Sequence, residues 1–119
     1  PMHYPFLWEC KSANSKKFSE FVRKGVAEAN PVYAAQVALY QAYMDLTENP
    51  ALFTVMNKDT SEIYYELIPF NKDLAQKTSD KGVEILKATK AGEMLPRIAA
   101  NSDYFTCKWC EFNKTCWAS

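Results

Sequence analysis

Histidine is almost absent from this chain, whose 119 residues include one, His3. A hydrolase that pairs serine or cysteine with histidine would have to use that residue, and the N-terminal segment is a poor place to hold it. A metal site built from several histidines cannot form within one such chain. Glycine and proline are also scarce, with three and six residues, which argues against a fibrous or low-complexity chain.

Long apolar runs and an excess of charge of one sign are absent as well. No run approaches membrane-spanning length and none resembles a signal peptide, so we expect a cytoplasmic protein with no membrane partner. The formal net charge is zero, which removes the simplest argument for nucleic-acid binding. Five cations between positions 11 and 24 could still form a local patch, or they could be solvated side chains on a helix. They are Lys11, Lys16, Lys17, Arg23 and Lys24.

The rest of the composition is that of one globular domain. Hydrophobic residues make up 48% and charged residues 24% of the chain, enough for one modest core. We expect a single domain over residues 1–119, in which 93–119 form a cysteine-rich tail. The chain starts at Pro1 with no methionine before it, which predicts a processed product or a fragment.

The order of apolar runs and turn residues predicts an α/β fold, a small mixed sheet flanked by helices. Strands are expected at 5–11, 51–56 and 62–68, with the last two paired as a hairpin. Helices are expected from position 14 or 15 to about 29, from 32 to about 47, and from 72 to about 92.

Local residues mark the helix ends and one buried face. Asn14 or Ser15 can cap the first helix, and Asn71 can cap the third. Asn30 and Pro31 supply the N-cap and first position of the second helix. The first helix should turn one apolar face to the core, made of Phe18, Phe21, Val22 and Val26.

Glu9 and Lys11 stand one residue apart at the end of the first apolar run. In a strand they point to the same face and Cys10 points to the other. A buried carboxylate and ammonium cost desolvation free energy, which a chain tolerates most readily where the pair does chemistry. The carboxylate can hold a divalent cation, and the ammonium can steady a nucleophile or a developing negative charge. An ordinary salt bridge at a strand end is the alternative.

Gln36 and Tyr40 are four residues apart in the second predicted helix, so they share one face of it. They could bind a phosphate oxygen, or brace Glu9 if this face covers the polar end of the strand. The alternative is an amphipathic helix whose tyrosine is half in the core and whose glutamine is on the surface.

The C-terminal segment carries Cys107, Cys110 and Cys116, in a C-x2-C-x5-C pattern. The first pair has the spacing of a metal knuckle, and three thiolates suit zinc or an iron–sulphur cluster. Trp109, Phe112 and Trp117 would shield such a site. A fourth ligand is missing locally and could lie upstream of Pro1, since Cys10 is interpreted as a core thiol. A disulfide or free thiols are the alternative, and a cytosolic chain disfavours the disulfide.

These features occur in a fixed order and resemble the RecB-type branch of the PD-(D/E)xK nuclease superfamily. More closely, the chain is similar to phage and prophage nucleases of that branch that end in a "CKWC" segment. The resemblance covers nearly the whole chain. It rests on Trp8-Glu9-Cys10-Lys11-Ser12, Lys16-Lys17-Phe18, Tyr33 to Tyr43, Asn57-Lys58, Pro96-Arg97-Ile98 and Cys107-Lys108-Trp109-Cys110.

The resemblance implies a restriction-endonuclease-like core and a Mg²⁺- or Mn²⁺-dependent deoxyribonuclease. The substrate would be DNA, with an exonuclease role in phage recombination or DNA end processing in a bacterial host. It assigns metal binding to Glu9 and the main-chain carbonyl of Cys10, and a catalytic role to Lys11. It places Gln36 and Tyr40 near the metal and DNA.

The resemblance also implies a 4Fe–4S cluster at Cys107, Cys110 and Cys116, with Zn²⁺ as the alternative. A single-strand annealing recombination protein is the partner expected by family analogy.

One departure from the family concerns aspartate. The family carries an aspartate on the strand before Glu-x-Lys, and no aspartate precedes Glu9 here. All five follow it: Asp45, Asp59, Asp73, Asp80 and Asp103. We therefore expect an N-terminally incomplete nuclease domain with little cleavage of its own and a bare sheet edge that a homodimer could cover. The competing functions are a catalytically inactive DNA-binding or scaffold module with a metal-stapled tail, and a zinc-stapled interaction domain.

Overall fold

The computed structural model describes residues 3–118, which divide into two compact units. Within the described residues the first unit ends at Val83 and the second starts at Glu84, so the boundary falls inside the long helix α4 (Lys72–Ala91). The tail predicted from residue 93 is thus part of a second unit that starts nine residues earlier. Each unit is described by itself below.

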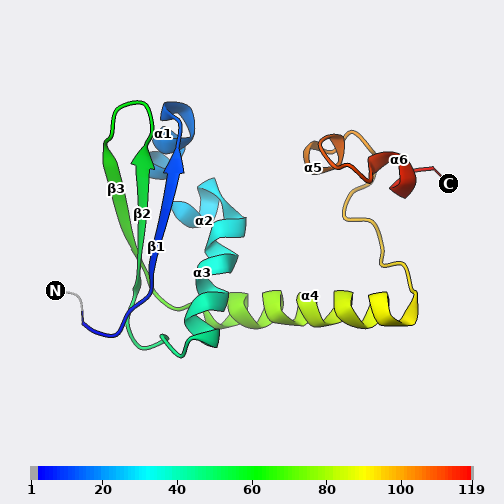
Figure 1. Cartoon of the computed structure of the whole chain (residues 1–119), viewed down its shortest axis with the longest axis horizontal. Coiled ribbons are helices and arrows are strands. Elements are labelled where there is room, and N and C mark those ends of the chain that lie inside the picture. The colour runs from blue at the N-terminus through cyan, green and yellow to red at the C-terminus, as the bar shows by residue number, and fades with distance from the viewer. Residues whose placement is uncertain (1–2, 119) are drawn as a thin grey trace. The chain divides into compact units, whose positions relative to one another are not determined.

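A three-stranded sheet forms the centre of the first unit (Figure 1). Its strands are β1 (Trp8–Ala13), β2 (Ala51–Asn57) and β3 (Ile63–Ile68), in that order across the sheet. β1 pairs with β2 in parallel, and β2 pairs with β3 as the predicted antiparallel hairpin. The expected mixed α/β fold with a small sheet is confirmed.

β1 begins and ends later than the predicted strand at 5–11. The ladder starts where the backbone N–H of Leu52 donates to the carbonyl of Leu7 and continues until that of Lys58 donates to Ala13, both at 2.8 Å. Pro5 has no N–H to offer at the near end. At the far end, Ser12 does not stop the strand because its side chain points to an exposed face of the sheet.

The helix predicted from position 14 to 29 is wrong in one respect, because it is two helices. α1 (Ser15–Lys24) ends at Gly25, whose φ of 80° lies in the left-handed region that favours glycine, and α2 (Val26–Ala29) follows. The carboxylate of Glu66 on β3 accepts the backbone N–H of Val26 at 3.0 Å, so the break is fixed by a side chain of the sheet.

α3 (Pro31–Tyr43) starts as predicted and ends about four residues early. The side chain of Asn30 accepts the N–H of Tyr33 at 3.3 Å, which confirms the cap. Asp45 has a φ of 55°, and the N–H of Leu46 returns to the carbonyl of Gln41 at 2.8 Å, so the chain turns before Thr47.

The helices α1, α2 and α3 cover one face of the sheet, and the core lies between (Figure 1). Phe21 of α1 lies 6.0 Å from Phe53 of β2, measured between ring centroids, and both are at most 1% exposed. Val22, predicted for the same face, is 53% exposed, because α1 buries only a narrow stripe of side chains. Val26 is buried as predicted, but it belongs to the next helix because the chain turns at Gly25.

The opposite face of the sheet carries large exposed hydrophobic residues within the described part of the chain. Register places its side chains in three rows across the strands, and none of them is charged. The large hydrophobic residues exposed on this face are Trp8, Met56, Ile63, Tyr65 and Leu67. This open face is continuous with the free edge of β1, which pairs only with β2 among residues 3–118.

α4 begins at its predicted cap, where the side chain of Asn71 accepts the N–H of Leu74 at 3.0 Å. Gly92, with a φ of 69°, ends it through bonds from Gly92 to Thr89 and from Glu93 to Ala88, which is the Schellman pattern. The second unit adds two short helices, α5 (Phe105–Lys108) and α6 (Asn113–Cys116). No helix of the described residues has the length and apolarity that a membrane crossing requires.

Candidate functional site

Glu9 and Lys11 project from β1 to the helix-covered face, as the strand alternation predicts. The ammonium Nζ lies 3.2 Å from the carboxylate Oε1, and the side chains are 19% exposed for Lys11 and 17% for Glu9. Partial burial strengthens their attraction relative to a solvated surface pair. Glu9 and Lys11 therefore form a partly buried ion pair at the margin of the core, still accessible to solvent.

Gln36 on α3 completes the contact between helix and strand. Its side-chain Oε1 accepts a hydrogen bond from the ammonium of Lys11 at 2.7 Å, and its Nε2 donates to the hydroxyl of Tyr40 at 3.1 Å. An ammonium is a donor only, so Lys11 fixes which end of the Gln36 amide faces the strand. The helix therefore meets Lys11 directly, and its link to Glu9 runs through the Lys11 ammonium.

The relay from Lys11 through Gln36 sets the role of the Tyr40 hydroxyl. Because that oxygen accepts from Gln36, its own proton is directed elsewhere. Tyr40 is 40% exposed, so the proton can reach solvent or a bound molecule. The outer end of the relay is thus suited to an electron-rich acceptor such as a phosphate oxygen.

Tyr33 joins the site although the sequence reasoning did not single it out. Its ring centroid lies 4.5 Å from the Lys11 ammonium. The spacing of Tyr33, Gln36 and Tyr40, at i, i+3 and i+7, would have placed the three on one helical face. The cap at Asn30 gave the position of Tyr33 within the first turn, so the signal was present in the sequence.

Glu66 also lies on the helix-covered face of the sheet, and its carboxylate already accepts two hydrogen bonds. In the register, Glu9 faces Phe53, which in turn faces Glu66 on β3. Glu66 accepts the N–H of Val26 and the hydroxyl of Tyr64, the latter at 2.7 Å. Burial, and then the nearby Glu66 carboxylate, raise the pKa of Tyr64 to about 12. Glu66 therefore ties β3 to the start of α2 and does not serve as a second carboxylate beside Glu9.

A metal ion at Glu9 would have few protein ligands. Within residues 3–118, no three His, Cys, Asp or Glu side chains lie close enough together to hold a metal ion. The main-chain carbonyls of Leu7 and Ala13 face β2, so by strand alternation that of Cys10 faces the free edge. Glu9 and the Cys10 carbonyl can both reach the edge region, and water or a phosphate would have to supply the remaining oxygens.

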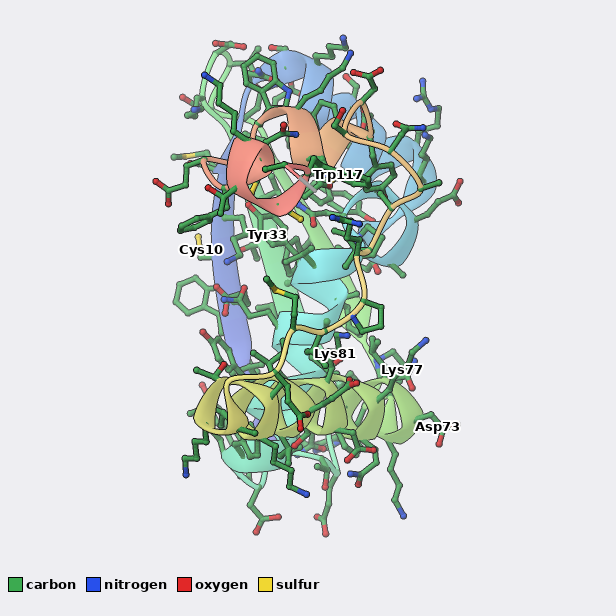
Figure 2. All side chains as sticks on the ribbon, turned by 90° about the vertical axis from the view of Figure 1, so that its right-hand side faces the viewer. Cys10, Tyr33, Asp73, Lys77, Lys81 and Trp117 are labelled. Atoms are coloured by element: carbon green, nitrogen blue, oxygen red, sulfur yellow. The ribbon has the colours of Figure 1, made fainter. Side chains whose placement is uncertain are left out.

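Cys10 is not the core thiol that the sequence analysis expects. It is exposed, on the side of β1 away from Tyr33 (Figure 2). There it lines a hollow of about 370 Å³ together with Trp8 and Met56. Alternation was predicted correctly, but the other face of the sheet is not covered by any described residue of the first unit, so the thiol is left at the surface.

The basic residues of α1 divide into two groups. Lys17 donates to Glu20 at 3.1 Å and to the carbonyl of Ala29 at 2.7 Å, so it holds α1 to the end of α2. Its ammonium also lowers the pKa of Glu20 through a hydrogen bond and charge attraction. Lys16 and Arg23 are exposed, as both a basic patch and solvated helix side chains would require.

The three cysteines of the second unit do not form a metal-binding group in the described residues. Cys110 and Cys116 are exposed, and Cys107 is half-buried. The segment is held instead by Asn113, whose side-chain amide donates to the carbonyl of Cys107 at 2.8 Å and of Ser102 at 3.2 Å. The geometry does not fit a zinc ion or an iron–sulphur cluster as it stands.

The aromatic residues of this segment shield less than predicted. Trp109 is 81% exposed and Phe112 is 65% exposed. Trp117 is half-buried, and the Arg97 guanidinium lies 4.7 Å from its ring centroid. Arg97 also donates twice to the carbonyl of Cys116, at 2.8 and 3.0 Å, which fixes the end of the segment through its backbone.

Comparison of the chain with protein-family models, with curated proteins and with solved structures finds no match. The nuclease resemblance therefore stays a prediction from the sequence. The features that bear on function are the contacts among Glu9, Lys11, Gln36 and Tyr40.

Proposed function

We propose that the protein is a metal-dependent DNA nuclease that hydrolyses phosphodiester bonds, with a restriction-endonuclease-like core. The observation that carries the proposal is the 2.7 Å bond from Lys11 to Gln36. It joins a Glu-x-Lys pair on a strand to a Gln-x3-Tyr pair on a helix 25 residues later. A plain salt bridge at a strand end needs no such relay, whereas a relay that ends in the exposed hydroxyl of Tyr40 can serve an anionic substrate.

The proposed roles follow from donors and acceptors. Glu9 offers a carboxylate to a divalent cation, together with the Cys10 carbonyl at the strand edge. Bound Mg²⁺ or Mn²⁺ would supply an activated water and neutralise charge on the phosphate. Lys11 donates to an oxygen of the phosphate as negative charge develops there, and Tyr40 donates to a second oxygen. Gln36 orients both donors.

A single carboxylate is compatible with this proposal. Magnesium commonly keeps several waters and takes one or two carboxylates plus substrate phosphates. The substrate would thus complete the coordination, and affinity for the metal alone should be weak. An acidic residue on a strand added at the free edge of β1 would raise that affinity, as the resemblance implies.

The test is cleavage of single- and double-stranded DNA with Mg²⁺ or Mn²⁺ by the longest natural form of the protein. Lys11→Ala should lower the single-turnover rate by roughly 10²–10³-fold, because a donor to developing charge is lost. Lys77→Ala is the matched control, since Lys77 projects from the exposed face of α4 (Figure 2). Equal rates for the two variants would remove Lys11 from the mechanism.

A catalytically inactive DNA-binding or scaffold module is the second candidate, and a specific observation favours it. The described residues offer one carboxylate at the site and no group of three metal ligands. This candidate predicts DNA binding without cleavage over a range of substrates and metals. Fluorescence anisotropy with labelled DNA separates the two: binding by the natural form with no cleavage in either metal supports the module, and cleavage excludes it.

A further inference from the structure

The ammonium of Lys11 is enclosed on three sides. It lies 3.2 Å from the Glu9 carboxylate, 2.7 Å from the Gln36 amide oxygen, and 4.5 Å from the ring centroid of Tyr33. The last distance is within the range in which a cation is attracted to the face of an aromatic ring. A lysine ammonium has three N–H donors, and the two acceptors account for two of them.

The ring of Tyr33 is itself held in place. It stacks on Phe21 with ring planes 3° apart and centroids at 6.2 Å, and it lies 6.2 Å from the ring of Phe53. Its backbone N–H is tied to the side chain of Asn30 in the cap of α3. Turning the Tyr33 ring away from Lys11 would therefore break its stacking on Phe21.

From this geometry we propose that Tyr33 is the positioning residue for Lys11. Two acceptors fix two N–H bonds, and the aromatic face attracts the ammonium without using a donor. The third N–H has no acceptor among these three neighbours and is the one left for a substrate oxygen. A neutral apolar residue in place of Tyr33 would leave the ammonium free to shift toward either acceptor.

The rotamer of Lys11 can be tested in the protein without DNA or metal. The ε-methylene protons of Lys11 lie near the ring face, so their NMR signals should fall upfield of those of the other lysines, with Lys11→Arg used for assignment. Tyr33→Phe keeps the ring and should keep the displacement. Tyr33→Leu removes the ring current together with the contact, so its readout is the NOE between the Lys11 ε-methylene protons and the side-chain amide protons of Gln36, which should weaken if Lys11 shifts. Val37→Ala is the packing control, because Val37 is a fully buried core residue of the same helix.

The catalytic consequence is tested by steady-state kinetics and rests on the proposed function. Tyr33→Leu should lower kcat by roughly 5–30-fold, the range expected for a partly desolvated cation–aromatic contact. KM should stay within about twofold, because Tyr33 positions a group that acts in the transition state and does not hold the substrate. Tyr33→Phe should keep kcat near that of the natural protein, because the aromatic ring is retained. A Val37→Ala variant of equal or lower stability should keep kcat near that of the natural protein.

The two experiments separate the possible failures. Absent cleavage by the natural protein overturns the nuclease assignment, while the NOE between Lys11 and Gln36 in Tyr33→Leu still decides whether Tyr33 holds Lys11. An unchanged NOE between Lys11 and Gln36 in Tyr33→Leu overturns the positioning role whatever the enzyme does. A loss of kcat in Tyr33→Leu that Val37→Ala reproduces at matched stability also overturns it, since a general loosening of α3 would then be the cause.

Discussion

Two polar regions of the chain differ in what holds their side chains. In the first unit, the charged end of Lys11 is bound by Glu9, Gln36 and the ring of Tyr33. In the second unit, the hydrogen bonds of the cysteine segment run from Asn113 and Arg97 to backbone carbonyls, and the thiols lie outside them.

The difference shows what a sequence pattern can specify. Side-chain direction in a strand or helix follows from its period, so residues on facing elements can be brought together by the backbone alone. A C-x2-C spacing only states which residues could share a ligand. The thiols converge when something else draws them together, whether a metal or a covering layer. The strand and helix patterns in the first unit therefore specify which side chains meet. The cysteine pattern in the second unit specifies only which residues are present.

The largest test of this contrast compares two phenylalanines. Phe53 is 0% exposed at the centre of β2, and Phe112 is 65% exposed in the second unit. Phe53→Ala should lower the free energy of unfolding by about 3–5 kcal/mol, a large part of the total for a small domain. Phe112→Ala should change it by less than about 0.5 kcal/mol. Urea denaturation followed by amide NMR signals of each unit measures both. Similar losses would mean that Phe112 is buried in solution.

The elements of the first unit were predictable because they depend on local signals. Asn14, Asn30 and Asn71 each cap a helix through a hydrogen bond three residues on, as the sequence indicates. The hairpin and the shared face of Glu9 and Lys11 follow from alternation. The break at Gly25 could not be read in the same way, because Glu66, 41 residues later, supplies the acceptor for the next helix.

The sequence predicted part of the site, and it missed Tyr33 and the connections between the members. Gln36 and Tyr40 were identified as a pair, but their partner in the structure is Lys11, because α3 crosses the strand at that level. The exposure of Cys10 was missed since it depends on whether a second layer covers the sheet, which no property of β1 itself determines.

A second test compares the two glycines with positive φ. An added Cβ at Gly25 would lie 3.3 Å from the Glu66 carboxylate, whereas one at Gly92 meets nothing within 4 Å. Both alanine variants bear the cost of a left-handed residue, about 1–2 kcal/mol. Gly25→Ala should cost more, and should also weaken the bond from Glu66 to Val26. Thermal unfolding with hydrogen exchange at the Val26 amide checks this, and equal costs at the two positions would show that Glu66 simply moves aside.

A third test concerns the thiols. Their exposure predicts that Cys10, Cys110 and Cys116 react readily with a thiol reagent in the folded protein, with Cys107 slower by roughly tenfold. Mass spectrometry after timed labelling gives each rate, and metal analysis of the same sample gives the zinc and iron content. Protection of the three C-terminal thiols while Cys10 reacts, together with bound metal, would show that these thiols converge on a ligand. It would support the metal-stapled tail predicted from the sequence.

The smallest expected effect depends on pH. Hydrogen bonds from the backbone N–H and hydroxyl of Ser15, both 2.8 Å, hold the pKa of Asp59 below its ordinary value. A lowered pKa in the folded state stabilises the protein above the unfolded pKa, and that stabilisation is lost as the pH falls through the folded pKa. Asp59→Asn should therefore be less stable than the natural chain at neutral pH, and the gap should close in acid. Asp103→Asn in the second unit controls for the lost charge. A gap that persists at low pH would assign the effect to packing.

The parallel pairing of β1 with β2 has a consequence for the order of folding. It joins residues that are 44 positions apart, such as Trp8 and Leu52, whereas the bonds that hold the cysteine segment span 19 positions or fewer. Long loops close slowly and at a cost in chain entropy, so distant strand pairing tends to limit the folding rate. The Lys11 contacts form only when α3 has docked on that pairing. We therefore expect the contacts of Lys11 to be among the last to form in the first unit. The turns around Asn113 should close early and independently.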